Sequence, residues 1–208
     1  MSMKIALKQF NLDVAQCDGL IATAHRVDAA GQFIFSAQDR KQITITAFLN
    51  LFIAWEAFLE ASIPLMMTGK KTINGSRPRK FVSPKTLEKA NRILLHTNTK
   101  FFDFSNHDFV RTVITNYFDQ GFPFQPHLSG LHSDLGDMKT IRNACAHISS
   151  STQNALEVLA LRVFGAPHVG IGVYDLLTAI DPKSPIGDTV FNSYKNRVAV
   201  AVDLIAKG

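Results

Sequence analysis

Apolar residues recur at helical spacing along most of the chain, and few segments show the strict alternation of a half-buried strand. The segments with helical spacing or a long apolar run are 17–30, 43–67, 83–96, 105–120, 128–151 and the C-terminal stretch from residue 188. Residues 154–165 fit either a helix or a strand, and residues 32–39 fit an edge strand or irregular chain. The pattern predicts an all-α fold, an up-and-down bundle of about five to seven helices in one domain over residues 1–208.

Glycine, proline and serine residues predict where several of these helices begin and end. In the longest apolar segment, Pro64 ends or kinks the helix, and Gly69 follows as a stop signal. Ser83 suits the N-cap of the next helix, and Pro84 suits its first position. Gly165 closes the segment that precedes it.

The apolar segment 43–67 is long enough to raise the question of a membrane span. Asn50, Glu56 and Glu60 lie within it, and carboxylates are costly in hydrocarbon. Residues 1–20 also lack the long apolar run of a signal peptide. We therefore expect a buried helix of a soluble, cytoplasmic protein with no membrane partner.

Composition indicates a large apolar core and a mildly basic surface. The chain has 16 Phe residues, and because Phe has no polar group, most of them should lie in the core or in an interface. The net charge of +5 suits a protein that binds a polyanion, but many proteins of this charge bind no nucleic acid. Cys17 and Cys145 have no metal-ligand spacing and favour a reducing compartment.

The segment IRNACAHISS, residues 141–150, contains an unusual combination of polar side chains. Asn143 and His147 are one helical turn apart, and Arg142 precedes them. Cleavage of RNA by its own 2′-hydroxyl group needs a base, an acid and a cation beside the phosphate. Histidine can serve as acid or base near neutral pH, and arginine matches the geometry of phosphate. Asparagine can orient the histidine or donate to phosphate, and this chemistry needs no metal and no cofactor.

Arg and His at this spacing also occur by chance, as a surface cation and a histidine at a helix C-terminus. The same cluster also fits a polar network between helices in a non-catalytic helical module that binds a protein or a nucleotide.

The motif RNACAH, which follows the apolar segment FLNLFIAWEAFLEASI in the chain, resembles the HEPN superfamily of all-helical ribonucleases. The family motif is an Arg followed by Asn, Asp or His and then by a later His, and Arg142, Asn143 and His147 match it in order. The resemblance is strongest over residues 40–165. It implies a homodimer with facing motifs, in which His147 is acid or base, Arg142 binds the scissile phosphate and Asn143 supports both.

The resemblance also implies the products and the biological setting. Cleavage would be metal-independent and leave a cyclic phosphate. The protein would belong to a toxin–antitoxin or phage-defence system, with an antitoxin or sensor protein as its partner. HEPN toxins that are neutralised by a nucleotidyltransferase have a tyrosine two residues after the histidine. Here that position is Ser149, so modification of that tyrosine is excluded.

Two further sets of residues are candidates for the same site. Glu56 joins the catalytic set as a carboxylate that orients Arg142 or His147, because a carboxylate in so apolar a segment needs a partner if it is buried. Glu56 and Glu60 also fit a polar stripe on the helix or pairs with Lys70 and Lys71, and this second interpretation is favoured for Glu60. The loop 69–85 is strongly basic, and its cations fit either contacts with RNA phosphates or a solvated surface. The predicted RNA-binding residues are Lys70, Lys71, Arg77, Arg79 and Lys80.

Other polar and aromatic clusters have simpler interpretations. His127, His132 and Asp134 suggest a metal, but their spacing is unusual for a helical metal site, and helix capping by Ser133 or Asp134 is favoured. The Phe residues of 101–104 and 122–124 can stack on bases, although core packing is commoner. The sequence has no Gly-rich phosphate loop and no nucleophile elbow.

Overall fold

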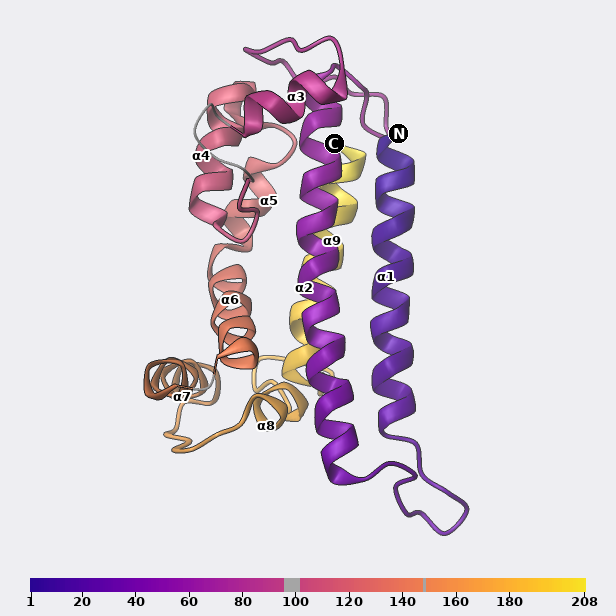
Figure 1. Cartoon of the computed structure of the whole chain (residues 1–208), viewed down its shortest axis with the longest axis vertical. Helices are drawn as coiled ribbons and strands as arrows, with labels where there is room; N and C mark the ends of the chain where they lie inside the picture. The colour runs from indigo at the N-terminus through magenta and orange to yellow at the C-terminus, as the bar shows by residue number, and fades with distance from the viewer. Residues whose placement is uncertain (96–101, 148) are drawn as a thin grey trace. The chain divides into compact units, whose positions relative to one another are not determined.

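The computed structural model describes residues 1–95, 102–147 and 149–208. Within this part of the chain, the backbone forms nine α-helices, one 3-10 helix and isolated β-bridges, without a strand (Figure 1). The helices are α1 Met3–Ala24, α2 Ala37–Met67, α3 Leu87–Leu94, α4 His107–Tyr117, η1 Asp119–Gly121, α5 Gln125–Gly130, α6 His132–Ala146, α7 Ser150–Phe164, α8 Val173–Thr178 and α9 Val190–Lys207. The predicted all-α class is confirmed. The helices outnumber the five to seven expected because α5 and α8 have only 6 residues each, too few for a clear periodic pattern.

The chain divides into two compact units. Unit 1 consists of Met1–Asn11, Ala54–Leu135 and Val198–Gly208, and unit 2 of Leu12–Ile53 and Gly136–Arg197. Each unit has its own set of buried apolar side chains. The predicted helix end at residue 96 and Phe101 of the predicted aromatic series lie outside the described residues.

The first helix begins much earlier than its apolar pattern predicts. Expected over 17–30, it runs from Met3 to Ala24. In unit 1, Met3, Ala6 and Phe10 are buried, and the Phe10 and Phe58 rings make an edge contact at 6.0 Å. The prediction was wrong here because the many polar residues between these apolar positions obscure the helical period, and packing against α2 stabilises the helix instead.

Helix α2 also begins earlier than predicted, six residues before position 43. The Ser36 hydroxyl accepts a hydrogen bond from the Asp39 backbone N–H at 3.1 Å, which satisfies a donor of the first turn. At the other end the helix continues through Pro64 to Met67. Gly69, with φ +82°, then donates to the Met66 carbonyl at 2.9 Å, so the predicted glycine stop is confirmed.

The predicted start of the third helix is wrong. Thr86, not Ser83, is the N-cap of α3, and its side chain accepts from the Lys89 N–H. Ser83 instead accepts a hydrogen bond from the Lys80 ammonium at 3.1 Å, within the predicted loop. Ser83, Pro84 and Thr86 all suit helix starts, and only the fold selects among them.

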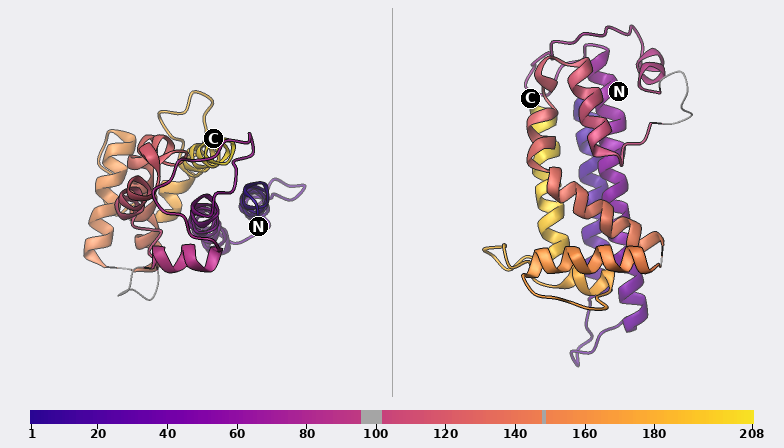
Figure 2. Two further views of the ribbon diagram at one scale, coloured as in Figure 1. Left: turned by 90° about the horizontal axis from the view of Figure 1, so that it is seen from above. Right: turned by 90° about the vertical axis from the view of Figure 1, so that its left-hand side faces the viewer.

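The predicted helix 128–151 is interrupted at both ends. A break at Leu131 separates α5 from α6, so Ser133 and Asp134 lie within the first turn of α6 rather than at its N-cap. At the other end α6 stops at Ala146. In unit 2, α7 runs across this end of α6 (Figure 2), and it ends at Gly165 with φ +74°, as predicted.

A polar network ties together three helices of unit 2. The Asp137 carboxylate of α6 forms an ion pair with Arg162 of α7 and accepts a hydrogen bond from the Tyr194 hydroxyl of α9 at 3.0 Å. The hydrogen bond with Asp137 raises the pKa of Arg162. The side chain of Asp137 is only 13% exposed, so the network fixes α7 against α6 close to the predicted motif.

Candidate functional site

The predicted motif lies at the C-terminal end of α6 and is exposed. Arg142 and His147 are exposed and Asn143 is half-buried. The Arg142 guanidinium donates to the Asn143 side-chain oxygen at 3.2 Å. His147 follows the last residue of the helix, and its N–H donates to the Asn143 carbonyl at 2.9 Å. The three residues are therefore neighbours in space as well as in sequence.

The backbone of His147 is fixed by the next helix as well. Ser149 is the N-cap of α7, in a capping box with Thr152. The Thr152 hydroxyl also donates to the His147 carbonyl at 2.7 Å. The motif histidine thus lies between two helix ends, each of which is hydrogen-bonded to the backbone of His147.

We expect Ser149→Ala to lower the free energy of unfolding by about 1 kcal/mol, because the α7 N-terminus loses its capping oxygen. Chemical denaturation followed by circular dichroism measures this change. Ser150→Ala is the matched control, since Ser150 is exposed in the first turn of α7, and it should change stability by less than about 0.5 kcal/mol. Equal effects of the two substitutions on the free energy of unfolding would contradict the role of Ser149 as a stabilising N-cap.

His147 lines a groove of about 450 Å³ that lies within unit 2, here called the His147 groove. Its walls come from the N-terminal half of α2, the end of α6, the first turns of α7 and the start of α8. Besides His147, its polar lining includes Gln38, Lys41, Gln42, Ser149, Thr152 and Gln153. Leu49 and Leu156 contribute apolar wall. A groove with an imidazole and an ammonium among its otherwise mixed polar and apolar walls suits an anionic ligand.

Lys41 is a groove residue that the sequence analysis missed. Its side chain is exposed. Among the described residues that line the groove, Lys41 is the one lysine, and no arginine occurs there. The available signal was the spacing of Gln38, Lys41 and Gln42, which lie on one helical face. The predicted helix began at residue 43, after these residues, so their shared face was not recognised.

Arg142 and Asn143 are not among the residues that line the His147 groove. The three motif residues are thus neighbours at the C-terminal end of α6, but of the three only His147 lines the groove. This division is explained by the helix: Arg142 is five residues before His147, which is about 140° around the axis. In one copy of the chain, the guanidinium extends into solvent.

Cys145 also lines the groove and does not provide a nucleophile. Burial raises the pKa of its thiol to about 11, so the thiol is protonated near neutral pH. No thiolate chemistry is therefore expected at this groove.

Glu56 and the basic loop belong to unit 1, whereas the motif belongs to unit 2. Glu56 is half-buried and Glu60 exposed. In the loop, Arg79 lies 3.7 Å from Asp119, and Lys80 contacts Ser83, while Lys70, Lys71 and Arg77 are exposed. The roles of Glu56 beside the motif and of the loop in RNA binding stay predictions.

The histidines of α5 and α6 do not form a metal site. No group of three His, Cys, Asp or Glu side chains with suitable geometry occurs among the residues described. The His132 Nδ1 atom lies 3.3 Å from the Arg111 guanidinium and 3.7 Å from the Asp108 carboxylate. A cation beside this nitrogen repels a metal ion, so its position favours a surface hydrogen-bond network.

In the comparisons with models of protein families, with curated proteins and with solved structures, the chain has no match. Among the described helices, α2 is long and apolar enough to cross a membrane, and half of its most apolar stretch is buried within the fold. Length and composition are weak evidence for a membrane span, because the core helix of a soluble protein has the same properties.

Proposed function

We propose that this protein is a metal-independent endoribonuclease of the HEPN type that acts through His147 and Arg142. The observation that supports the proposal is that His147 is exposed in the wall of a groove rather than sealed in the core. Arg142 and Asn143 are hydrogen-bonded to each other one turn before it. His147 and Arg142 are both exposed near the end of α6, where an imidazole can exchange a proton and a guanidinium can bind phosphate.

In the proposed reaction, the 2′-hydroxyl of RNA loses its proton to an imidazole and attacks the adjacent phosphorus. The bond from phosphorus to the 5′ oxygen breaks, and that oxygen takes a proton from an acid. The products are a 2′,3′-cyclic phosphate and a 5′-hydroxyl. The Arg142 guanidinium stabilises the charge that develops on the phosphate oxygens.

The reaction needs an acid and a base, and the described residues that line the groove of one copy include a single histidine. A homodimer with facing motifs supplies the second imidazole and brings a second guanidinium to the phosphate. We propose this dimer as the active form, in a cytoplasmic toxin–antitoxin or phage-defence system with an antitoxin or sensor protein as partner. Lys41 joins the set of residues that bind the RNA backbone.

The wild-type protein is expected to cleave single-stranded RNA in excess EDTA and to leave 2′,3′-cyclic phosphate ends. Gel electrophoresis before and after treatment with a cyclic-phosphate-opening phosphatase measures both properties. Activity that disappears with EDTA and returns with a divalent cation would contradict the proposed chemistry.

The alternative is a non-catalytic helical module that binds a protein or a nucleotide. The observation in its favour is that Arg142 does not line the His147 groove. Under this alternative, RNA stays intact with both wild-type protein and His147→Ala, although the protein is folded.

A further inference from the structure

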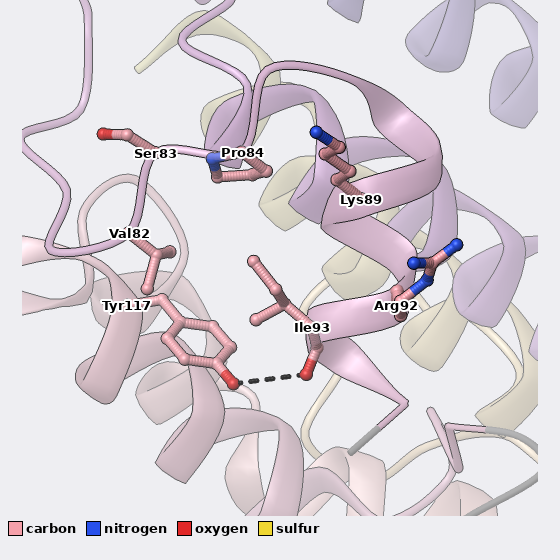
Figure 3. Close-up of a pocket in the computed structure, with 7 residues that line it drawn as sticks. All are labelled: Val82, Ser83, Pro84, Lys89, Arg92, Ile93 and Tyr117. Atoms are coloured by element: carbon pink, nitrogen blue, oxygen red, sulfur yellow. Dashed lines mark hydrogen bonds between the residues drawn. The ribbon is translucent and has the colours of Figure 1, made fainter. Parts of the chain in front are cut away.

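Unit 1 contains a second concavity, which shares no lining residue with the His147 groove. It is a solvent-open pocket of about 740 Å³ between residues 82–84 of the loop, the outer face of α3 and the end of α4 (Figure 3). This volume lies within the range of small-ligand pockets in proteins. Neither the motif nor the predicted RNA-binding residues line it.

The walls of the pocket are mostly apolar and include an aromatic ring. Val82, Pro84 and Ile93 point toward its centre, and the Tyr117 ring closes one side (Figure 3). The Tyr117 hydroxyl donates to the Ile93 carbonyl at 3.5 Å, which ties the ring to α3. Burial raises the pKa of Tyr117, so the ring carries no charge at neutral pH. The pocket thus offers a fixed, neutral surface to a flat apolar group.

The rim of the pocket is positively charged. The Lys89 amine is turned toward the side where Pro84 lies, whereas the Arg92 guanidinium points away (Figure 3). Arg92 is paired with Glu88 at 3.1 Å. Lys89 is exposed, and no ion pair or side-chain hydrogen bond of its amine occurs among the described residues. Its charge is therefore available to a ligand.

The segment of chain around the pocket adds further positive charge. Residues 77–92 contain six Lys or Arg residues and a single Glu. Lys80 contacts Ser83 at the pocket edge. A basic surface of this kind attracts a polyanion, and its combination with an aromatic wall is typical of sites that bind single-stranded nucleic acid.

We infer that this pocket binds one nucleotide of a single-stranded RNA, with the base against Tyr117 and Ile93 and the phosphate at Lys89. The inference rests on the proposed function in taking RNA as the ligand. It assigns an RNA-binding site to residues outside the motif. Single-stranded RNA is favoured over a duplex because only an unpaired base can leave its stack and contact an apolar wall.

The test is the binding of a short fluorescent single-stranded RNA in EDTA, measured by fluorescence anisotropy on the full chain with His147→Ala, so that cleavage does not interfere. Adding Lys89→Ala should weaken binding about five-fold and reduce the slope of log affinity against log salt by about 0.7. Lys4→Ala is the matched control, because Lys4 is an exposed lysine of unit 1 outside the pocket. It should change the affinity less than two-fold, as a roughly neutral surface change.

A second pair of variants tests the aromatic wall. Tyr117→Leu should weaken binding about ten-fold, and Tyr117→Phe, which keeps the ring, should stay within about two-fold of the parent. Circular dichroism confirms that each variant is folded. Equal affinities of Tyr117→Leu and Tyr117→Phe would overturn the assignment of the base to this wall.

Three outcomes separate this inference from its alternatives. Equal RNA affinities of the Lys89→Ala and Lys4→Ala proteins would overturn the assignment of RNA to this pocket. If the wild-type protein still cleaves RNA in that case, the proposed function stands. Binding that depends on Lys89 in a chain whose wild type does not cleave supports the pocket and overturns the ribonuclease. If adenosine monophosphate binds as tightly as the single-stranded RNA, the ligand of the pocket is a free nucleotide and the assignment of RNA is overturned.

Discussion

Replacing His147 with alanine is expected to lower RNA cleavage by about 10²–10⁴-fold, the usual contribution of a general acid or base. The imidazole is exposed in the groove wall, so its loss removes a proton carrier without opening the core. The rate is measured with purified wild type and variant in excess EDTA, under single-turnover conditions. The variant should still form the same oligomer as wild type by size-exclusion chromatography with light scattering.

The stability of His147→Ala distinguishes catalysis from a structural role. The hydrogen bonds that fix residue 147 involve its backbone N–H and carbonyl, which alanine retains. The free energy of unfolding should therefore change by less than about 0.5 kcal/mol. His168→Ala, an exposed histidine of unit 2 outside the groove, is the matched control and should cleave as wild type does. If the His147→Ala protein cleaves RNA at the wild-type rate, the proposed mechanism is wrong.

Replacing Arg142 with alanine should reduce cleavage by about 10²–10³-fold, comparable to the loss of one donor that stabilises a developing anion. Arg142→Lys keeps the positive charge but loses the planar fork that bonds phosphate at two points, so an intermediate rate is expected. Because Arg142 is exposed, neither substitution should lower stability by more than about 0.5 kcal/mol.

The control for Arg142 is Arg26→Ala, which removes an exposed arginine of unit 2 and alters the net charge by the same amount. This protein should cleave RNA at the wild-type rate. A comparable loss of activity in Arg26→Ala and Arg142→Ala would mean that only the overall charge matters. Full activity in Arg142→Lys would exclude two-point binding of the phosphate.

Features that depend on neighbouring residues were predicted well from sequence. Gly69 and Gly165 end their helices with positive φ, because glycine adopts this conformation without the strain that a side chain brings. The helical spacing of segment 128–151 also agrees with the structure of α6, in which Leu135, Met138 and Ile141 follow the helical period and are buried.

Helix boundaries were predicted less well where several local signals compete. Ser83 and Thr86 both suit an N-cap, and the structure uses Thr86. Ser149 lies within a segment that continues the helical period, yet it caps a new helix. In such cases the free energies of the local choices differ by about 1 kcal/mol, so contacts with distant parts of the chain decide between them.

The sequence by itself determined the all-α class, most helix positions and the neighbourhood of Arg142, Asn143 and His147, because these depend on spacing along one helix. Only the tertiary structure brought Lys41 into the same groove as His147, more than one hundred residues later in the chain, and joined Tyr117 to Lys89 in the pocket of unit 1. The physical reason is that helical periodicity fixes which face of a helix is buried, whereas the partner of that face is selected by side-chain packing across the fold.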